Sequence, residues 1–312
     1  MARLSSRECV MLREQLVEIL SQQYLHGLNI VASDVRLTAL SGTHQVWECA
    51  FDVNGLTERV IVKQLHEHAG QAFSFASTFA LQQRLFTMGM AAEPIYLSPH
   101  KSNRTNAKPD EQGVLWVEAF VPAETEHAQI QTLAQTLAQT LARALAQLHQ
   151  AAIDTPTDKS TDTPTDKSTD TPIRQLDPIT QCKALISALN THHDASDSST
   201  ACALSQALDI LINDMQDCQH SDDTPVLCHN DLHRDHIRAK DVCVDWEYAA
   251  LGPRYFDVAM CIVINQLPPS AQTQLLKEYA QLTDCDVDIA TQQTALYIRL
   301  AVIINQAWAL LS

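Results

Sequence analysis

The stretch Leu227–Asp257, LCHNDLHRDHIRAKDVCVDWEYAALGPRYFD, carries the strongest information on fold and chemistry in this chain of 312 residues. Two of its carboxylates, Asp231 and Asp245, each follow a short apolar segment that we expect to be a strand. Such a pair suits phosphoryl transfer, because one carboxylate can accept a proton from an attacking hydroxyl while the other holds magnesium. We therefore expect Asp231 to be catalytic and Asp245 to be a metal ligand.

The composition argues against several classes of protein. A formal net charge of −16 without a Lys/Arg cluster argues against a nucleic-acid partner. The nine cysteines include no CxxC pair, which favours reduced thiols in a cytoplasmic protein over disulfides or a zinc site. The most apolar stretch, Ala295–Leu311, contains Arg299, Asn305 and Gln306, so we expect a core helix and no membrane span.

The first part of the chain is predicted to be a mostly antiparallel sheet, preceded by a helix over residues 6–25. Asn54-Gly55 lies between two strand-like segments and is typical of a tight hairpin turn. A helix is predicted over Phe73–Met90. The expected strands are Val35–Ala39, Val46–Val53, Arg59–Leu65, Ile95–Leu97 and Val114–Phe120.

The second part is predicted to be mainly helical, which gives an N-terminal lobe of residues 1–117 and a C-terminal lobe of residues 118–312. A leucine spacing over 128–151 indicates a long helix that ends near His149. The tract that follows repeats DTPTDKST, so we expect a disordered loop over 154–172, because such a composition cannot bury a core. Further helices are expected over Asp177–Asn190 and Ser199–Cys218, and again from about Asp257 onward.

The central stretch resembles the aminoglycoside phosphotransferase and choline kinase branch of the protein-kinase-like fold. Members of that branch show a His-x-Asp loop, then Asp-Trp/Phe-Glu-Tyr, then an aromatic-Asp pair. The residues that carry the resemblance are His229, Asp231, Asp245, Glu247, Tyr248, Arg254, Phe256 and Asp257. The resemblance implies an α+β bilobal fold with a small antiparallel-sheet lobe, and it gives His229, Asp257 and His149 structural roles around the catalytic loop.

The resemblance also implies an ATP site in the first lobe. Lys63 lies on the third predicted strand, where the family keeps a lysine that contacts ATP phosphates. Ser41 and Gly42 lie where a phosphate-covering loop is expected. The backbone of Val117 and Ala119 lies where the family contacts adenine. The implied cofactors are ATP and Mg²⁺.

Two departures from the family pattern bear on activity. His236 occupies the position of a metal-binding Asn, and imidazole is a poorer ligand for magnesium than for manganese. His236 is thus a candidate metal ligand with Asp245. Three alternatives follow from the replacement: one metal is held mainly by Asp245, Asp235 helps to hold it, or the site favours Mn²⁺. The helix predicted over Phe73–Met90 contains no acidic residue to pair with Lys63. The candidate substitutes are Thr78, Gln82, Gln83 and Glu67.

The acceptor is expected to be the hydroxyl of a small cationic metabolite of the choline, ethanolamine or thiamine type. Carboxylate and aromatic side chains suit a cation, and the candidate substrate contacts are Glu247, Trp246, Tyr297 and Trp308. Ile264-Asn265 stands where eukaryotic choline kinases carry an acidic-aromatic pair, which argues against a strict choline kinase. An aminoglycoside phosphotransferase and a catalytically degenerate, ligand-binding pseudokinase stay open as alternatives, as does the oligomeric state.

Overall fold

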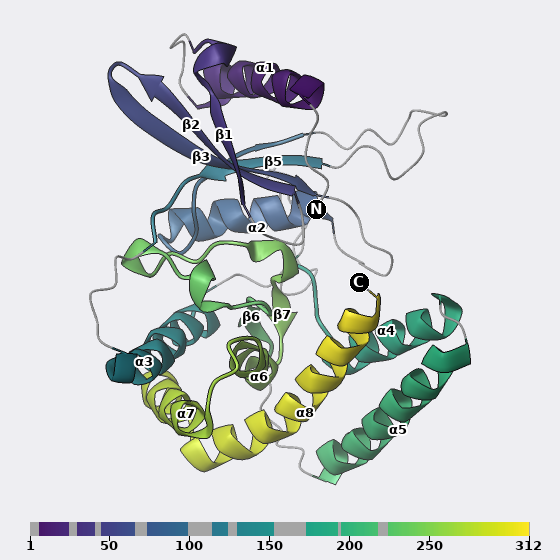
Figure 1. Ribbon diagram of the computed structural model, residues 1–312. Coiled ribbons are helices and arrows are strands. Elements are labelled where there is room, and N and C mark those ends of the chain that lie inside the picture. The colour runs from purple at the N-terminus through teal and green to yellow at the C-terminus, as the bar shows by residue number, and fades with distance from the viewer. Residues whose placement is uncertain are drawn as a thin grey trace, which may run out of the picture. The chain divides into compact units, whose positions relative to one another are not determined.

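The computed structural model describes residues 6–24, 30–40, 45–65, 74–98, 114–123, 130–152, 173–192, 195–217 and 224–311. The chain divides into two compact units, Met1–Pro122 and Ala123–Ser312. The fold class is α+β, as predicted, with a small antiparallel sheet in the first unit and mainly helices in the second (Figure 1). The division falls after strand β5 (Val114–Ala119), whereas the predicted boundary at residue 117 lies inside this strand. The repeat at 154–172 lies outside the described residues.

The first unit is built on a five-stranded antiparallel sheet of order β1-β2-β3-β5-β4. Asn54 and Gly55 join β2 to β3 and have φ of 52° and 81°, the left-handed conformation that the predicted two-residue hairpin requires. Val53 pairs with Leu56 directly at this turn. The other strands are β1 (Arg36–Leu40), β2 (Gln45–Val53), β3 (Leu56–Leu65) and β4 (Pro94–Leu97).

Two helices cover opposite faces of this sheet (Figure 1). Alternate side chains of a strand point to opposite faces, so Val117 of β5 joins one core cluster and Trp116 joins the other. Helix α1 (Ser6–Gln23) packs Leu16 and Leu20 into the first cluster. Helix α2 (Phe75–Thr87) packs against the second cluster, and Ser74 caps it by accepting a hydrogen bond from the N–H of Ala76.

The second unit is a helical assembly, and one of its cores lies between four helices. Its helices are α3 (Ile130–His149), α4 (Pro178–His192), α5 (Ala195–Asp217), α6 (Arg254–Ile264), α7 (Pro269–Thr283) and α8 (Val287–Leu311). Helices α4, α5, α6 and α8 share one core cluster, and α3 packs against α7. By length and composition alone α8 could cross a membrane, but it packs Leu300 and Ile304 into this core, as core helices of globular domains do.

A long excursion between two short strands carries the motif residues. Strands β6 (Val226–Cys228) and β7 (Ala250–Gly252) pair antiparallel, with Cys228 opposite Ala250, so residues 229–249 leave and return at the same point. Within the excursion, the N–H of Val244 donates to the carbonyl of His236 at 2.9 Å. This pairing places the segment around Asp231 beside the segment around Asp245. The short strand expected directly before Asp245 is only an isolated bridge between Ile237 and Cys243, and β7 was not predicted.

A buried carboxylate fixes the start of this excursion. Asp257 lies in the first turn of α6 and is fully buried. Its Oδ1 accepts the backbone N–H of Asn230 at 2.7 Å, and its Oδ2 accepts the N–H of His229 at 2.9 Å. A carboxylate that accepts two successive N–H groups determines the direction in which the chain leaves β6.

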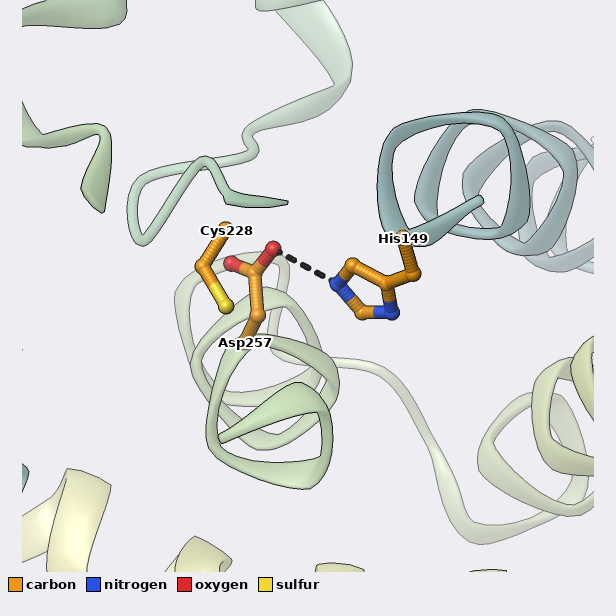
Figure 2. A group of neighbouring side chains, drawn as sticks. All are labelled: His149, Cys228 and Asp257. Carbon is orange, nitrogen blue, oxygen red and sulfur yellow. Dashed lines mark hydrogen bonds and ion pairs between the residues drawn. The ribbon is translucent and has the colours of Figure 1, made fainter. Parts of the chain in front are cut away.

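His149, at the end of α3, supports Asp257 from a second element (Figure 2). Its Nε2 lies 3.1 Å from Asp257 Oδ2, and its Nδ1 lies 2.7 Å from the hydroxyl of Tyr279 on α7. Cys228 lies beside them, so three ligand-type side chains meet in one buried group. Both ring nitrogens of His149 and both oxygens of Asp257 already have hydrogen-bond partners, which makes this group a support for the loop.

The charges of the group follow from its surroundings. Burial opposes ionisation of Asp257, but the hydrogen bond from His149 and the interactions with His149 and His229 outweigh it, so the pKa of Asp257 lies below its usual value. Burial, followed by repulsion from His236, lowers the pKa of His229 to about 4. At neutral pH the loop is therefore held by an ionised Asp257 beside a neutral His229.

We predict that Asp257→Asn lowers the free energy of unfolding by about 3 kcal/mol, because an amide group would turn a donor toward the loop N–H groups. The pKa of Asp257 is lowered by folding, so its stabilisation is present above about pH 4 and is lost as the pH falls through the lower folded value. The variant should thus lose less stability on acidification than the wild type.

Urea unfolding at neutral and acidic pH measures both effects. The control is Asp209→Asn on the exposed face of α5, which should change stability by less than about 0.5 kcal/mol. Equal stability of the two variants would contradict the role of Asp257.

Candidate active site

Asp231 and Asp245 lie together on the excursion between β6 and β7, about two-thirds buried. Both segments have unusual backbone geometry: Asn230 and Asp245 have φ of 63° and 69°, a left-handed conformation that costs a non-glycine residue about 1 kcal/mol. The side-chain amide of Asn230 donates to the carbonyl of Tyr248 at 3.0 Å, which ties one segment to the other. The fold therefore sustains local strain in order to orient the two carboxylates.

His236 lies between the two carboxylates. Its Nδ1 is 2.7 Å from the backbone carbonyl oxygen of Asp231, and its Nε2 is 3.5 Å from Oδ2 of Asp245. A carbonyl oxygen only accepts hydrogen bonds, so Nδ1 carries a hydrogen and Nε2 of the neutral ring keeps its lone pair. This lone pair is directed toward the Asp245 side of the site, where a metal ligand is needed.

The three side chains fit a divalent metal. Asp231, His236 and Asp245 each offer one ligand atom, and these atoms all lie within 4.8 Å of one another. Two carboxylate oxygens suit magnesium or manganese, whereas the imidazole nitrogen suits manganese better. The sequence-based candidates for metal binding thus lie in one place, with Asp231 as a third member.

The surroundings of Asp231 keep its proton affinity high. Burial raises the pKa of Asp231 to about 7, with further contributions from the negative charges of Asp245, Glu247 and Asp257, while His236 acts in the opposite direction. A carboxylate with a pKa near neutrality is well matched to proton acceptance at physiological pH. Asp231 can therefore take up a proton from a neighbouring hydroxyl.

The rings of Trp246 and His229 pack against each other within the loop that carries Asp231, His236 and Asp245. The indole of Trp246 is only 1% exposed, lies 4.9 Å from the His229 ring between centroids, and donates to the carbonyl of Cys243. His229 Nε2 lies 3.0 Å from the carbonyl oxygen of Val244. The expectation that Trp246 contacts substrate was wrong in this respect, since its ring is buried under the loop and supports His229.

The other expected substrate residues have different surroundings. Glu247 is 8% exposed and interacts with the hydroxyl of Tyr248, whose pKa is raised by burial and by Glu247. Tyr297 on α8 packs edge-on against Phe256, and Trp308 on the same helix is half-buried against the core. Among the described contacts, Tyr297 and Trp308 therefore have core positions, while Glu247 lies beside the site.

Asn265 supports the loop in a way that the sequence did not reveal. It ends α6, its Oδ1 accepts the N–H of Arg234 at 2.9 Å, and its Nδ2 donates to the carbonyl of Leu232 at 2.9 Å. Asn265 thus holds the middle of the loop, as Asp257 holds its start. An Asn after an apolar helix signals a helix end, but the segment that it binds cannot be identified from that signal.

The predicted nucleotide residues belong to the first unit. Lys63 is 9% exposed, and its Nζ lies 3.2 Å from Oε1 of Glu118. Val117 pairs with strands on both sides, and the N–H of Ala119 donates to the carbonyl of Glu93 at 2.8 Å. Val117 lies inside the sheet and the N–H of Ala119 is already used, so the adenine contacts expected there are not supported. Ser41 and Gly42 lie outside the described residues.

Comparisons with solved structures relate the whole chain to small-molecule kinases. Choline kinase LicA from Streptococcus pneumoniae matches with a TM-score of 0.63 and 15% identity, covering 95% of this chain and 90% of that one. Choline kinase from Cryptosporidium parvum Iowa II matches with a TM-score of 0.66 and 14% identity, covering 95% and 89%. Spectinomycin phosphotransferase APH(9)-Ia, in complex with ADP and spectinomycin, matches with a TM-score of 0.59 and 14% identity, covering 95% and 86%. At these identities the likeness establishes the protein-kinase-like fold.

The sequence itself gives the family. No curated protein matches it, but residues 107–293 match the phosphotransferase enzyme family, APH. The matched residues make up more than half of the chain and include Asp231, His236, Asp245 and Asp257. The chain therefore belongs to the phosphotransferase enzyme family, as the resemblance in its central stretch predicted.

Proposed function

We propose that the protein is an ATP-dependent phosphotransferase that phosphorylates a hydroxyl of a small cationic metabolite, of the choline, ethanolamine or thiamine type. The observation that carries the proposal is the grouping of Asp231, His236 and Asp245 within 4.8 Å on a loop anchored by a buried carboxylate. This arrangement offers a proton acceptor beside a set of metal ligands, which are the two protein contributions that phosphoryl transfer needs.

In the proposed reaction the hydroxyl oxygen of the acceptor would form a bond to the terminal phosphorus of ATP, while the bond from that phosphorus to the β-phosphate oxygen breaks and ADP leaves. Asp231 accepts the hydroxyl proton, and its pKa of about 7 suits that task. Asp245 and His236 would hold the divalent metal, which when bound neutralises phosphate charge. Lys63 would contribute a further positive charge to the phosphates. The ADP complex of the related spectinomycin phosphotransferase supports a nucleotide as the phosphate donor.

The preference for a cationic acceptor rests on charge. Asp231, Asp245 and Glu247 place three carboxylates around the loop, and the chain has a formal net charge of −16. Such a field attracts cations and increases their encounter rate. Similarity to two choline kinases supports an amino-alcohol acceptor, while similarity to spectinomycin phosphotransferase keeps an amino sugar as the second candidate.

A degenerate, nucleotide-binding member of the family is the alternative from a different class. It is favoured by His236, which replaces an oxygen ligand by nitrogen. Turnover separates the two: a coupled assay for ATP consumption, run with choline, ethanolamine, thiamine, homoserine and aminoglycosides in magnesium and in manganese, should detect phosphorylation of at least one acceptor. Nucleotide binding without turnover under all these conditions would favour the degenerate member.

We predict that Asp231→Asn lowers kcat by about 10²–10⁴-fold, because an amide cannot accept the hydroxyl proton. ATP binding measured without divalent metal should change by less than about threefold, since no proton is transferred in that step. Steady-state kinetics with the identified acceptor, together with calorimetric ATP titration, separates the two effects. Asp235→Asn is the control, because this side chain is on the same loop but is 68% exposed. Wild-type turnover in Asp231→Asn would remove Asp231 as the base.

Asp245→Asn should have a different profile. Its carboxylate is a proposed metal ligand, so the variant should bind nucleotide–metal at least about tenfold more weakly, in addition to losing turnover. Titration of ATP with and without the divalent metal measures this directly. If metal strengthened ATP binding equally in the wild type and in Asp245→Asn, Asp245 would not be a ligand.

His236→Asn tests the choice of metal. Replacing the imidazole by an amide oxygen should raise the affinity for magnesium relative to manganese by about tenfold. Electron paramagnetic resonance of bound Mn²⁺, with Mg²⁺ as competitor, gives this ratio without relying on turnover. His233→Asn is the matched control, because its ring packs edge-on against His236 at 5.9 Å and is outside the ligand group. An unchanged ratio in His236→Asn would place His236 outside the metal site.

A further inference from the structure

The sheet of the first unit brings four polar side chains together on the face that α2 covers. Val60 and Val62 of β3 point into the cluster shared with α1, so Lys63, the next residue, points to the α2 face. On β5 the same alternation places Trp116 and Glu118 on the α2 face, since Val117 points to the other. Gln82 enters from α2 itself and is fully buried.

Glu118 is the centre of this group and uses both carboxylate oxygens. Its Oε1 lies 3.2 Å from Nζ of Lys63, and its Oε2 accepts from Nε2 of Gln82 at 2.8 Å and from the indole N–H of Trp116 at 3.1 Å. Glu118 is 2% exposed and Lys63 is 9% exposed. A buried ion pair whose remaining lone pairs are satisfied by hydrogen bonds is held in a single geometry.

We propose that Glu118 is the positioning residue of Lys63. From strand β5 it supplies the negative charge that holds the ammonium group, whereas α2 contains no carboxylate that could do so. The proposal rests on the proposed function, in which Lys63 contacts nucleotide phosphate. Ile61 pairs with Glu118 and Lys63 pairs with Trp116 across β3 and β5, so backbone hydrogen bonds set the separation of the two charges. The ammonium group has three N–H donors, so a lysine can contact a carboxylate and phosphate oxygens at the same time.

This arrangement has a consequence for the role of α2. The helix contributes a neutral amide, Gln82, which also donates to the carbonyl of Ala92 at 3.0 Å. Gln82 therefore orients the carboxylate of Glu118 and ties the helix to the sheet, whereas the opposite charge for Lys63 comes from the neighbouring strand. Among the described contacts, strand pairing sets the separation of Lys63 and Glu118, and α2 reaches Glu118 through the hydrogen bond from Gln82.

A charge exchange between β5 and α2 tests the proposal. Glu118→Gln removes the carboxylate. The double variant Glu118→Gln/Gln82→Glu places a carboxylate on α2 instead, at a residue whose amide nitrogen lies 2.8 Å from Oε2 of Glu118 in the wild type. The full-length variants are compared by thermal unfolding and by calorimetric titration with ATP and divalent metal. Lys63→Met gives the affinity that remains without the ammonium group. Glu48→Gln is the control, because its ion pair with Arg59 lies on the same sheet and is more exposed.

Glu118→Gln should lower the melting temperature by about 6–12 °C, since it leaves a buried ammonium group without this carboxylate. It should also raise the Kd for ATP by about tenfold. The double variant should recover more than half of both losses, and Glu48→Gln should change the Kd by less than about twofold. If the single variant does not fold, the double variant, which keeps the charge, should still bind ATP far more tightly than Lys63→Met.

Two outcomes would overturn the positioning role alone: wild-type ATP affinity in Glu118→Gln, or a folded double variant that binds ATP no better than Lys63→Met. Recovery of the melting temperature without recovery of affinity would likewise assign Glu118 a purely structural role. A wild-type chain that binds no ATP would refute the proposed function, and the positioning role with it.

Discussion

The two N–H groups donated to Asp257 are the constraint on which the site depends. They fix His229 and Asn230 as the chain leaves β6, and the pairing of Cys228 with Ala250 fixes where it returns. Asp231, His236 and Asp245 meet because both ends of the excursion are held and its middle is bound by Asn265. A buried carboxylate can perform this task because His149 and the loop amides compensate for its lost hydration.

The charged side chains of the two units are held by different kinds of backbone. In the second unit, carboxylates surround a loop with a left-handed backbone at Asn230 and Asp245, and burial, together with the negative charges of the neighbouring carboxylates, raises the pKa of Asp231. In the first unit, Lys63 and Glu118 form an ion pair inside a regular sheet whose strand register sets its geometry. A carboxylate that accepts a proton near neutral pH needs surroundings that raise its pKa, whereas a phosphate-binding cation needs a fixed position.

Much of the architecture could be predicted from sequence because it follows from local patterns. The Asn54-Gly55 turn, the leucines of α3 and the spacing of Asp231 and Asp245 each carry their signal within a few residues. Contacts between distant segments could not be predicted: Glu118 pairs with Lys63 through strand order, and Asn265 binds a loop that is distant in sequence. Trp246 was misassigned because an aromatic residue beside a catalytic motif has the same local pattern whether its ring faces a ligand or the core.

The most direct test of the account is ³¹P NMR of the protein with ATP, divalent metal and the acceptor found by the ATP-consumption screen, compared with Asp231→Asn under the same conditions. The wild type should produce ADP together with a phosphate monoester on the acceptor hydroxyl, at a rate about 10²–10⁴-fold above the variant. Equal monoester formation by the two proteins, or conversion of ATP only to ADP and inorganic phosphate, would contradict it.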